Sequence, residues 1–288
     1  MNMSVSQLAS SPSPWTDAPN RSVTAAGTTF AYRLLGPSAG VPVVLLNHWG
    51  ANLDNFDPRI VDGLAASRPV IALDYRGVGA SGGEVPRTVA EMAGDTVAVI
   101  RALGLDRVDL LGFSLGGFVA QQVALSEPAL VRRIILAGTG PAGGVGIDRV
   151  GSVSWPLILK GLATFKDPKT YLFFTASETS RRAAREFLER LKERRSDRDR
   201  PAGLGVLLKQ VRAIHAWGRQ PPQDLGRIAH PVLVANGDRD IMVPSVNSED
   251  MARRLPNAEL VLYADAGHGG IFQNHEDFTR KAVAFLDA

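Results

Sequence analysis

One serine lies in the pentapeptide Gly112-Phe113-Ser114-Leu115-Gly116, between an apolar run and a helical pattern. The small residues around Ser114 allow a sharp strand-to-helix turn that lifts its hydroxyl above the edge of a sheet. The helix that follows directs free amides toward negative charge that develops beside the serine. The pentapeptide therefore predicts Ser114 as a nucleophile for acyl transfer. Its alternative interpretation is an ordinary glycine-rich turn.

A serine hydroxyl needs a base within hydrogen-bond reach, and the base needs an acid that orients it. Five histidines are available, and His268 is the one on a glycine-flanked loop directly after a predicted strand. Loops at strand ends are where catalytic groups of such sheets gather. The segment 236–244 follows the preceding strand and offers two carboxylates. Asp240 is predicted as the acid, with Asp238 as the second choice.

The elements that must position these residues alternate between strands and helices. Strands are predicted at 28–35, 41–46, 69–74, 108–112, 133–137, 231–235 and 258–263. Helices are predicted at 88–103, 116–125, 246–255 and 275–286. This alternation is typical of an α/β domain whose parallel sheet is covered by helices on both faces.

Strand patterns stop after residue 140 for about 85 residues, so 141–222 is expected to form a helical cap. The core then comprises 21–140 and 223–288, and 1–20 is expected to be a flexible leader. Most apolar cap residues should fill the cap's own core, while one or two face the serine and contact an apolar group of the substrate. The candidates are Trp155, Leu157, Phe165, Tyr171, Phe173, Phe174 and Trp217.

Composition is that of a globular protein, with 45% apolar residues, 21% charged residues and a net charge of +3. The excess charge lies in 181–200, where nine Lys/Arg face five Asp/Glu. Apolar residues recur there at helical spacing, so the run predicts an amphipathic helix with a solvated face, or else a surface for an anionic partner. No nucleic-acid partner is expected.

The chain contains no cysteine, which excludes disulfides, thiolate catalysis and a cysteine zinc site. Residues 1–20 lack the charged start and apolar middle of a secretory signal, and no apolar run is long enough to cross a bilayer. We therefore expect a cytoplasmic protein without a membrane partner. The predicted chemistry requires no metal and no organic cofactor.

From about residue 21 to its end, the chain resembles the α/β-hydrolase superfamily, in particular its serine esterases and lactonases with a helical cap. The resemblance rests on the joint spacing of 45–50, 74–81, 112–116, 237–244, 266–268 and the cap. It implies an eight-stranded, mostly parallel sheet and favours the second aspartate, Asp240, as the acid. It also implies an oxyanion hole formed by the backbone N–H groups of Leu115 and Trp49.

The chain departs from this pattern at Asn47-His48, where similar proteins usually have His-Gly. Glycine tolerates backbone angles that histidine does not adopt freely, so the path of this loop is expected to differ. His48 then has two interpretations. It either contacts the substrate or is a hydrogen-bonded structural residue.

A serine nucleophile indicates hydrolysis of a carboxylic ester or lactone through an acyl-enzyme intermediate. The same residues could instead use peroxide, as in cofactor-free haloperoxidases and perhydrolases, or cleave a C–C bond. A ligand receptor with this fold is less favoured, and so is an NAD-dependent oxidoreductase. The latter is suggested by G-x-G-x-x-G at 77–82, but it requires a helix to begin at the glycines, and the next helix is predicted only from Thr88.

Overall fold

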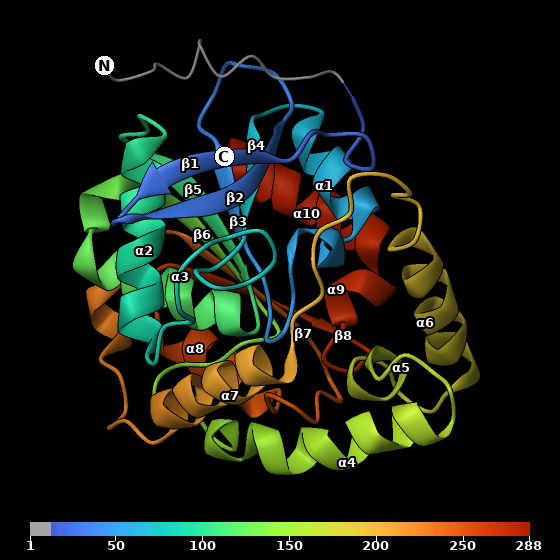
Figure 1. Cartoon of the computed structure of the whole chain (residues 1–288). Coiled ribbons are helices and arrows are strands. Elements are labelled where there is room, and N and C mark those ends of the chain that lie inside the picture. The colour runs from blue at the N-terminus through green and yellow to red at the C-terminus, as the bar shows by residue number, and fades with distance from the viewer. Residues whose placement is uncertain (1–12) are drawn as a thin grey trace.

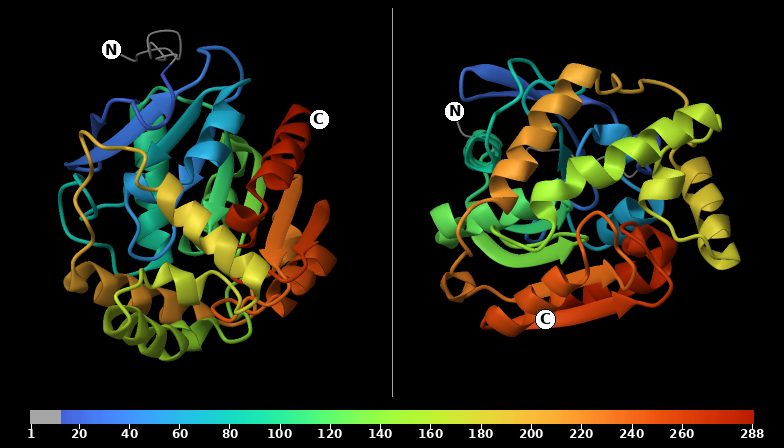
Figure 2. Two further views of the ribbon diagram at one scale, coloured as in Figure 1. Left: turned by 90° about the vertical axis from the view of Figure 1, so that its right-hand side faces the viewer. Right: turned by 90° about the horizontal axis from the view of Figure 1, so that it is seen from below.

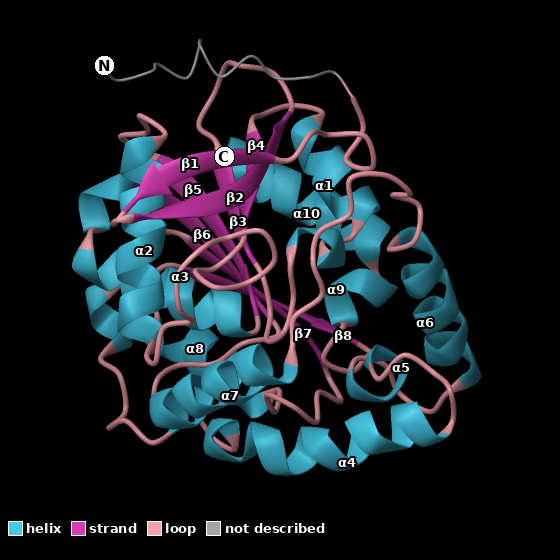
Figure 3. Ribbon diagram, in the orientation of Figure 1, coloured by secondary structure: helices cyan, strands magenta, loops and turns pink. Residues whose placement is uncertain are grey.

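The computed structural model describes residues 13–288 as a twisted sheet of eight strands with helices on both faces (Figures 1 and 3). The strand order is β1-β2-β4-β3-β5-β6-β7-β8. β2 is antiparallel to both its neighbours, and all other neighbours from β4 to β8 are parallel. The predicted fold class is confirmed.

The strands are β1 Arg21–Ala25, β2 Thr28–Leu35, β3 Val43–Leu46, β4 Val70–Leu73, β5 Val108–Phe113, β6 Val131–Ala137, β7 Val232–Gly237 and β8 Ala258–Tyr263. The core helices are α1 Pro58–Ala65, α2 Val89–Ala102, α3 Leu115–Ser126, α8 Val246–Arg254, α9 Gly270–Gln273 and α10 His275–Asp287. Sequence analysis missed β1 and α1. β1 is a short edge strand with mostly unburied residues, so it lacks the continuous apolar run that marks the central strands.

Helices α1 and α10 pack on one face of the sheet, and α2, α3 and α8 cover the other (Figure 1). Every residue of β3, β4, β5 and β7 is buried between these layers. Because these strands are parallel, the loops that follow β3, β5, β7 and β8 meet at one edge of the sheet. That edge is where ligands of open α/β sheets bind.

Four helices are inserted between β6 and β7: α4 Val150–Ala163, α5 Lys169–Leu172, α6 Glu178–Arg190 and α7 Leu204–Gly218. α4 and α7 lie across the end of the sheet to which the parallel strands point, as seen from below in Figure 2. The run 181–200 is helical only to Arg190, which corrects the longer predicted helix. Arg190 and Arg194 bind Asp57 and the Ala18 carbonyl, so the chain beyond α6 follows the core instead of continuing as a helix. Phe165, one of the seven candidates to face the serine, is 98% exposed.

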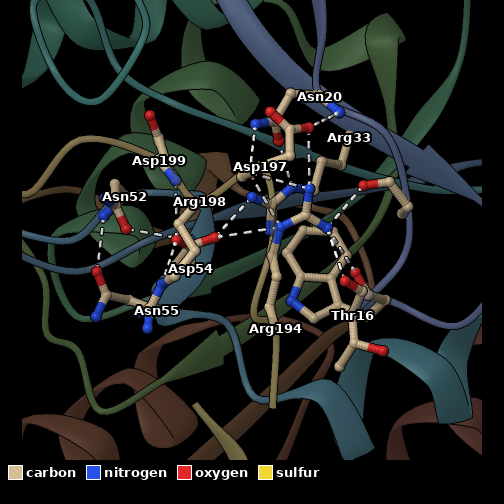
Figure 4. A network of polar contacts seen from close by, with 12 residues as sticks. Thr16, Asn20, Arg33, Asn52, Asp54, Asn55, Arg194, Asp197, Arg198 and Asp199 are labelled. Carbon is tan, nitrogen blue, oxygen red and sulfur yellow. Dashed lines mark hydrogen bonds and ion pairs between the residues drawn. The ribbon is translucent and has the colours of Figure 1, made fainter. Parts of the chain in front are cut away.

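Buried ion pairs join the inserted helices to the core. Arg190 at the end of α6 binds Asp57, which begins α1, with an Nη2–Oδ2 distance of 2.7 Å. Figure 4 shows a second network around Asp54, whose carboxylate accepts from Arg33 Nη2 at 2.6 Å and from the Asp199 amide at 2.9 Å. Both carboxylates are buried, so removal of either partner would leave an unpaired charge inside the protein.

The same network includes part of the segment expected to be a leader. Arg194 donates from Nη1 to the carbonyl oxygens of Thr16 and Ala18, at 2.9 and 2.8 Å. Trp15 is buried, packs edge-on against Phe56 and lies under the guanidinium of Arg33. Residues 13–20 therefore pack against the core, and the rest of the predicted leader lies outside the described residues.

The loop that fits G-x-G-x-x-G does not begin a helix. The amide of Gly77 donates to the carbonyl of Gly82 at 2.9 Å, which closes a turn. α2 begins only at Val89, after a capping box between Thr88 and Glu91. The loop thus lacks the helix N-terminus that would face a dinucleotide pyrophosphate. In the described part of the chain, no helix is both long and apolar enough to span a membrane.

Two carboxylates meet over Gly79 in this loop. A Cβ atom there would overlap Oδ2 of both Asp74, after β4, and Asp199, in the inserted segment. Asp74 is 2% exposed, and neither of its carboxylate oxygens has a hydrogen-bond partner in residues 13–288. Burial, followed by the nearby Asp199, raises the pKa of Asp74 well above its usual value, against the weaker opposing attraction of Arg33.

We predict that Asp74→Asn stabilises the protein above neutral pH. The wild-type folded state holds a proton that the unfolded chain releases near pH 4, so its stability falls as pH rises toward the raised pKa. The loss is about 1.4 kcal/mol for each unit of pKa shift. Urea unfolding at pH 5 and pH 8 should show this loss of stability in wild type. The control variant Asp106→Asn, which changes an exposed aspartate, should show the same loss. An equal loss in Asp74→Asn would contradict the prediction.

Candidate active site

Ser114 stands at the turn between β5 and α3 with φ 56° and ψ −116°, a conformation that a non-glycine residue adopts only under strain. Two glycines make this turn fit. A Cβ atom on Gly112 would overlap the carbonyl of Gly116, and one on Gly116 would overlap the carbonyl of Leu46. The sharp turn predicted from the pentapeptide is therefore present, with the serine as the residue that precedes the helix.

Hydrogen bonds to the neighbouring strand end hold this strained backbone. The amide of Ser114 donates to the carbonyl of Ala137 at 2.9 Å, and Thr139 Oγ1 donates to the carbonyl of Ser114 at 2.8 Å. Sequence analysis did not assign Thr139 a role. The sequence nevertheless placed Thr139 directly after the predicted strand 133–137, and a position at a strand end could have marked it as a residue of the site.

His268 and Asp240 form a buried pair at the ends of β8 and β7. His268 Nδ1 lies 2.7 Å from Asp240 Oδ2, and both side chains are fully shielded from solvent. The other oxygen of Asp240 accepts from the amides of Met242 and Val243 at 2.8 and 2.9 Å. Since an ionised carboxylate accepts at both oxygens, Nδ1 of His268 carries the proton and Nε2 is left as the basic atom.

Asp238, the second choice for the acid, lies elsewhere. Its Oδ1 accepts from the amide of Ala266 at 3.3 Å and so links the loops after β7 and β8. The structure brings Asp240, and not Asp238, to the imidazole of His268.

Ser114 and His268 approach the same turn after β6. The amide of Ser114 donates a hydrogen bond to the carbonyl of Ala137. A Cβ atom on Gly138, which follows Ala137, would contact the ring and the carbonyl of His268. The ring of Phe113, which precedes the serine, lies 5.0 Å from the imidazole of His268. Nε2 of His268 is buried and has no hydrogen-bond partner in the described residues. The residues next to Ser114 in the sheet, Phe113 and Gly138, therefore both lie against the imidazole of His268.

Two backbone amides that the resemblance assigns to an oxyanion hole are unpaired in the described residues. The amides of Leu115, at the start of α3, and of Trp49, after β3, have no hydrogen-bond acceptor in residues 13–288. The loop around Trp49 is fixed from the inserted helix α7. Trp49 Nε1 donates to the carbonyl of Leu207, and the Gly50 amide donates to Gln210 Oε1, both at 2.8 Å. Sequence analysis missed this role of Gln210 because its contact spans 160 residues.

His48 adopts an ordinary backbone conformation, and Gly50 has the positive φ, at 71°. The loop therefore does not need glycine at position 48. Asn47 supports it, since its Oδ1 accepts from the His48 amide and its Nδ2 donates to the carbonyl of Asn52, both at 2.9 Å. Tyr75 Oη adds a hydrogen bond to the Asn47 carbonyl at 3.2 Å.

The ring of His48 is buried beside the site. Its Nδ1 lies 2.9 Å from the Trp49 carbonyl, and Nε2 has no partner in the described residues. The rings of Phe113 and Phe173 each contact both His48 and His268. Desolvation, with smaller effects from Lys169 and His268, lowers the pKa of His48 to about 3. The imidazole is therefore neutral above pH 4.

Of the predicted cap residues, two contact this region. Phe173 packs on the His268 ring, and its carbonyl accepts from the Gly269 amide at 2.8 Å. Trp155 packs edge-on against Trp49, with ring centroids 5.5 Å apart. Trp217 instead stacks on Phe118 beneath the cap. In the part of the chain that the structure describes, no group of three or more His, Asp or Glu side chains could hold a metal ion.

Comparison with known proteins assigns the class. The α/β hydrolase fold family matches residues 41–275, most of the chain. A solved α/β hydrolase fold protein from Chitinophaga pinensis is 38% identical and superimposes with a TM-score of 0.90, covering 96% of this chain and all of that one. The chain therefore belongs to the α/β hydrolase fold family.

More distant relatives have names that specify an activity. A protein of Rhizobium rhizogenes named "Putative carbamate hydrolase RutD" is 28% identical over 85% of this chain and 92% of its own length. The structure of Est816, described as an N-acyl homoserine lactone degrading enzyme, is 24% identical with a TM-score of 0.73, over 92% of this chain and all of that one. At that identity, the likeness to Est816 shows the fold alone.

We predict that Gly116→Ala destabilises the protein by about 1–3 kcal/mol, because its methyl group would overlap backbone of β3 that has no room to move. The matched control is Gly94→Ala in α2, where a Cβ atom meets nothing within 4 Å. That change should be neutral or stabilise by up to about 1 kcal/mol. Urea unfolding of both variants checks the difference, and equal effects would show that the turn is not sterically constrained.

Proposed function

We propose that this α/β hydrolase is a serine hydrolase that cleaves a carboxylic ester or lactone through an acyl-enzyme intermediate. The observation that supports the proposal is the buried His268–Asp240 pair, which leaves Nε2 unpaired, together with the strained Ser114, whose neighbour Phe113 packs against the same imidazole. Ser114 is the nucleophile, His268 the general base and Asp240 the group that fixes the imidazole.

In the proposed cycle, Ser114 Oγ attacks the substrate carbonyl while His268 Nε2 accepts its proton. Asp240 stabilises the imidazolium that results, and its own two amide contacts hold the carboxylate in place. The amides of Trp49 and Leu115 donate to the tetrahedral oxyanion. His268 then protonates the leaving group, and water repeats the sequence on the acyl-enzyme.

The relatives favour an acyl carbonyl next to oxygen or nitrogen as the reacting group. The name carbamate hydrolase, carried by the Rhizobium rhizogenes relative, describes such a bond. A carbamate ester is therefore the second candidate substrate, and it uses the same residues. Attack by peroxide on the acyl-enzyme and cleavage of an activated C–C bond are further reactions open to this site. An inert Ser114 would indicate a ligand receptor instead.

We predict that Ser114→Ala and His268→Ala each lower kcat on p-nitrophenyl esters by several orders of magnitude, about 10⁴-fold or more. Asp240→Asn should also lose most activity, because it no longer fixes the tautomer, while Asp238→Asn keeps most of it. Activity is measured on a panel of substrates that includes esters, lactones and a carbamate ester, each with and without peroxide. If a fluorophosphonate labels wild type no faster than Ser114→Ala, the serine is not a nucleophile and the proposal fails.

His48 is proposed as a positioning residue for the oxyanion loop. The Trp49 carbonyl is an acceptor, so Nδ1 of His48 must be the donor, and this bond fixes the peptide that follows Trp49. Nε2 is then an unprotonated acceptor beside the site, open to a donor group of the substrate. Both interpretations from the sequence can hold, one for each ring nitrogen.

We predict that His48→Phe lowers kcat by about 10- to 100-fold with KM nearly unchanged, because a misplaced oxyanion donor weakens binding of the transition state alone. His48→Asn, which can still donate to the Trp49 carbonyl, should recover part of the rate. Steady-state kinetics checks this, with urea unfolding as the test of the fold. Unchanged kcat in a folded His48→Phe protein would leave His48 with a structural role only.

A further inference from the structure

A hollow of about 1160 Å³ lies between the inserted helices α4, α5 and α6 and the loops after β3, β7 and β8. Eight of its 22 lining residues are Lys or Arg and two are Asp. We call this hollow the basic groove. Its cations come from α4, α5, α6, the segments that join them and the loop after β7, so the charge is gathered by the fold and is not one solvated helix face.

Several of these cations have no counter-charge. Lys166, Arg181 and Arg185 are exposed and have no carboxylate partner in residues 13–288. Four other lining cations are paired: Arg198 with Asp54, Lys169 with Asp167, Lys192 with Glu189 and Arg239 with Asp265. The excess positive charge of the groove therefore comes from its unpaired cations, and such an excess attracts anions.

The floor of the groove is apolar. Leu172, Phe174 and Leu191 are buried side chains that line it. Lys160 lies over the ring of Tyr171, with its ammonium 4.5 Å from the ring centroid, which leaves that cation facing the same space. An apolar floor with a cationic rim is complementary to an apolar chain that ends in a carboxylate or phosphate.

The groove also borders the proposed catalytic residues. Ile241, which follows Asp240, and Gly267, which precedes His268, both line it. Phe174 lines it as well, and the adjacent Phe173 packs on the His268 ring. An acyl chain bound at Ser114 thus has a cationic region next to the loops that hold the acid and the base.

From these observations we infer that the basic groove binds an anionic head group, carboxylate or phosphate, at the far end of the substrate's apolar chain. The inference names the substrate class for the proposed hydrolysis and in that respect rests on it. Binding of the anion itself depends only on the groove.

The kinetic test compares p-nitrophenyl esters of dicarboxylic acids with four to ten carbons against esters of the matching monocarboxylic acids. Wild type should show a lower KM for the charged member at one or more chain lengths, and 0.5 M NaCl should remove the difference. In Arg181→Gln/Arg185→Gln, KM for the charged ester should rise roughly three- to tenfold, with KM for the uncharged ester unchanged.

Arg182→Gln is the matched control, because Arg182 is an exposed cation of the same helix that does not line the groove. An equal rise of KM in this variant would assign the effect to overall charge and overturn the inference. So would a wild type that prefers uncharged esters at every length.

A binding measurement separates this inference from the proposed function. Titration calorimetry with octanedioate, octyl phosphate and octanol on Ser114→Ala should show binding of one or both anions but not of the alcohol. The stronger anion identifies the head group. Weaker binding in the variant that also carries Arg181→Gln/Arg185→Gln supports the groove even if no ester is hydrolysed. Absence of anion binding to Ser114→Ala overturns the inference even if esters are hydrolysed.

Discussion

The close approach of β3, β5 and α3 at the carboxyl edge of the sheet is the constraint on which the rest of the site depends. Gly112 and Gly116 lie so close to neighbouring backbone that no side chain fits at either position. Because glycine has no side chain, the backbone can turn sharply at Ser114. The strained φ of the serine persists because hydrogen bonds from two sides fix the peptide units around it. The stability of the sheet thus holds the serine in a conformation that it would not adopt in an isolated peptide.

The inserted helices complete the site as well as cover it. The Phe173 carbonyl accepts from the loop that carries His268, and α7 fixes the loop of Trp49 through Leu207 and Gln210. The buried pair Arg190–Asp57 and the Asp54 network hold the same helices to the core. Because such pairs are costly to break, the inserted helices and the loops at the sheet edge are expected to move as one body.

The sheet, the elbow and the residues around it could be predicted from the sequence because each has a local signal. Apolar runs marked the buried strands, and the glycines marked the turn at Ser114. The sequence predicted Asp240 as the acid with Asp238 as the second choice, and the resemblance favoured the same residue. The geometry separates them because Asp240 reaches His268 while Asp238 binds the amide of Ala266. Contacts that cross the chain, such as that of Gln210 with Gly50, leave no pattern in the sequence. The same is true of Trp15, which lies in a polar, proline-containing segment and is nevertheless buried by long-range packing.

Electrostatics divides the edge of the sheet into two environments. Around Ser114 the rings of Phe113, Phe173 and His48 exclude water, and desolvation keeps His48 neutral, so this imidazole adds no positive charge that would compete with His268 for Asp240. Beside Phe174, in the basic groove, the lining is largely cationic. A dry environment strengthens the His268–Asp240 hydrogen bond and any oxyanion contact, whereas the solvated cations can attract an anion from a distance at little desolvation cost. The two environments are electrostatically connected, since Lys169 of the basic groove contributes to the lowered pKa of His48. In the proposed reaction, one part of a substrate reacts in the first environment while another part is recognised in the second.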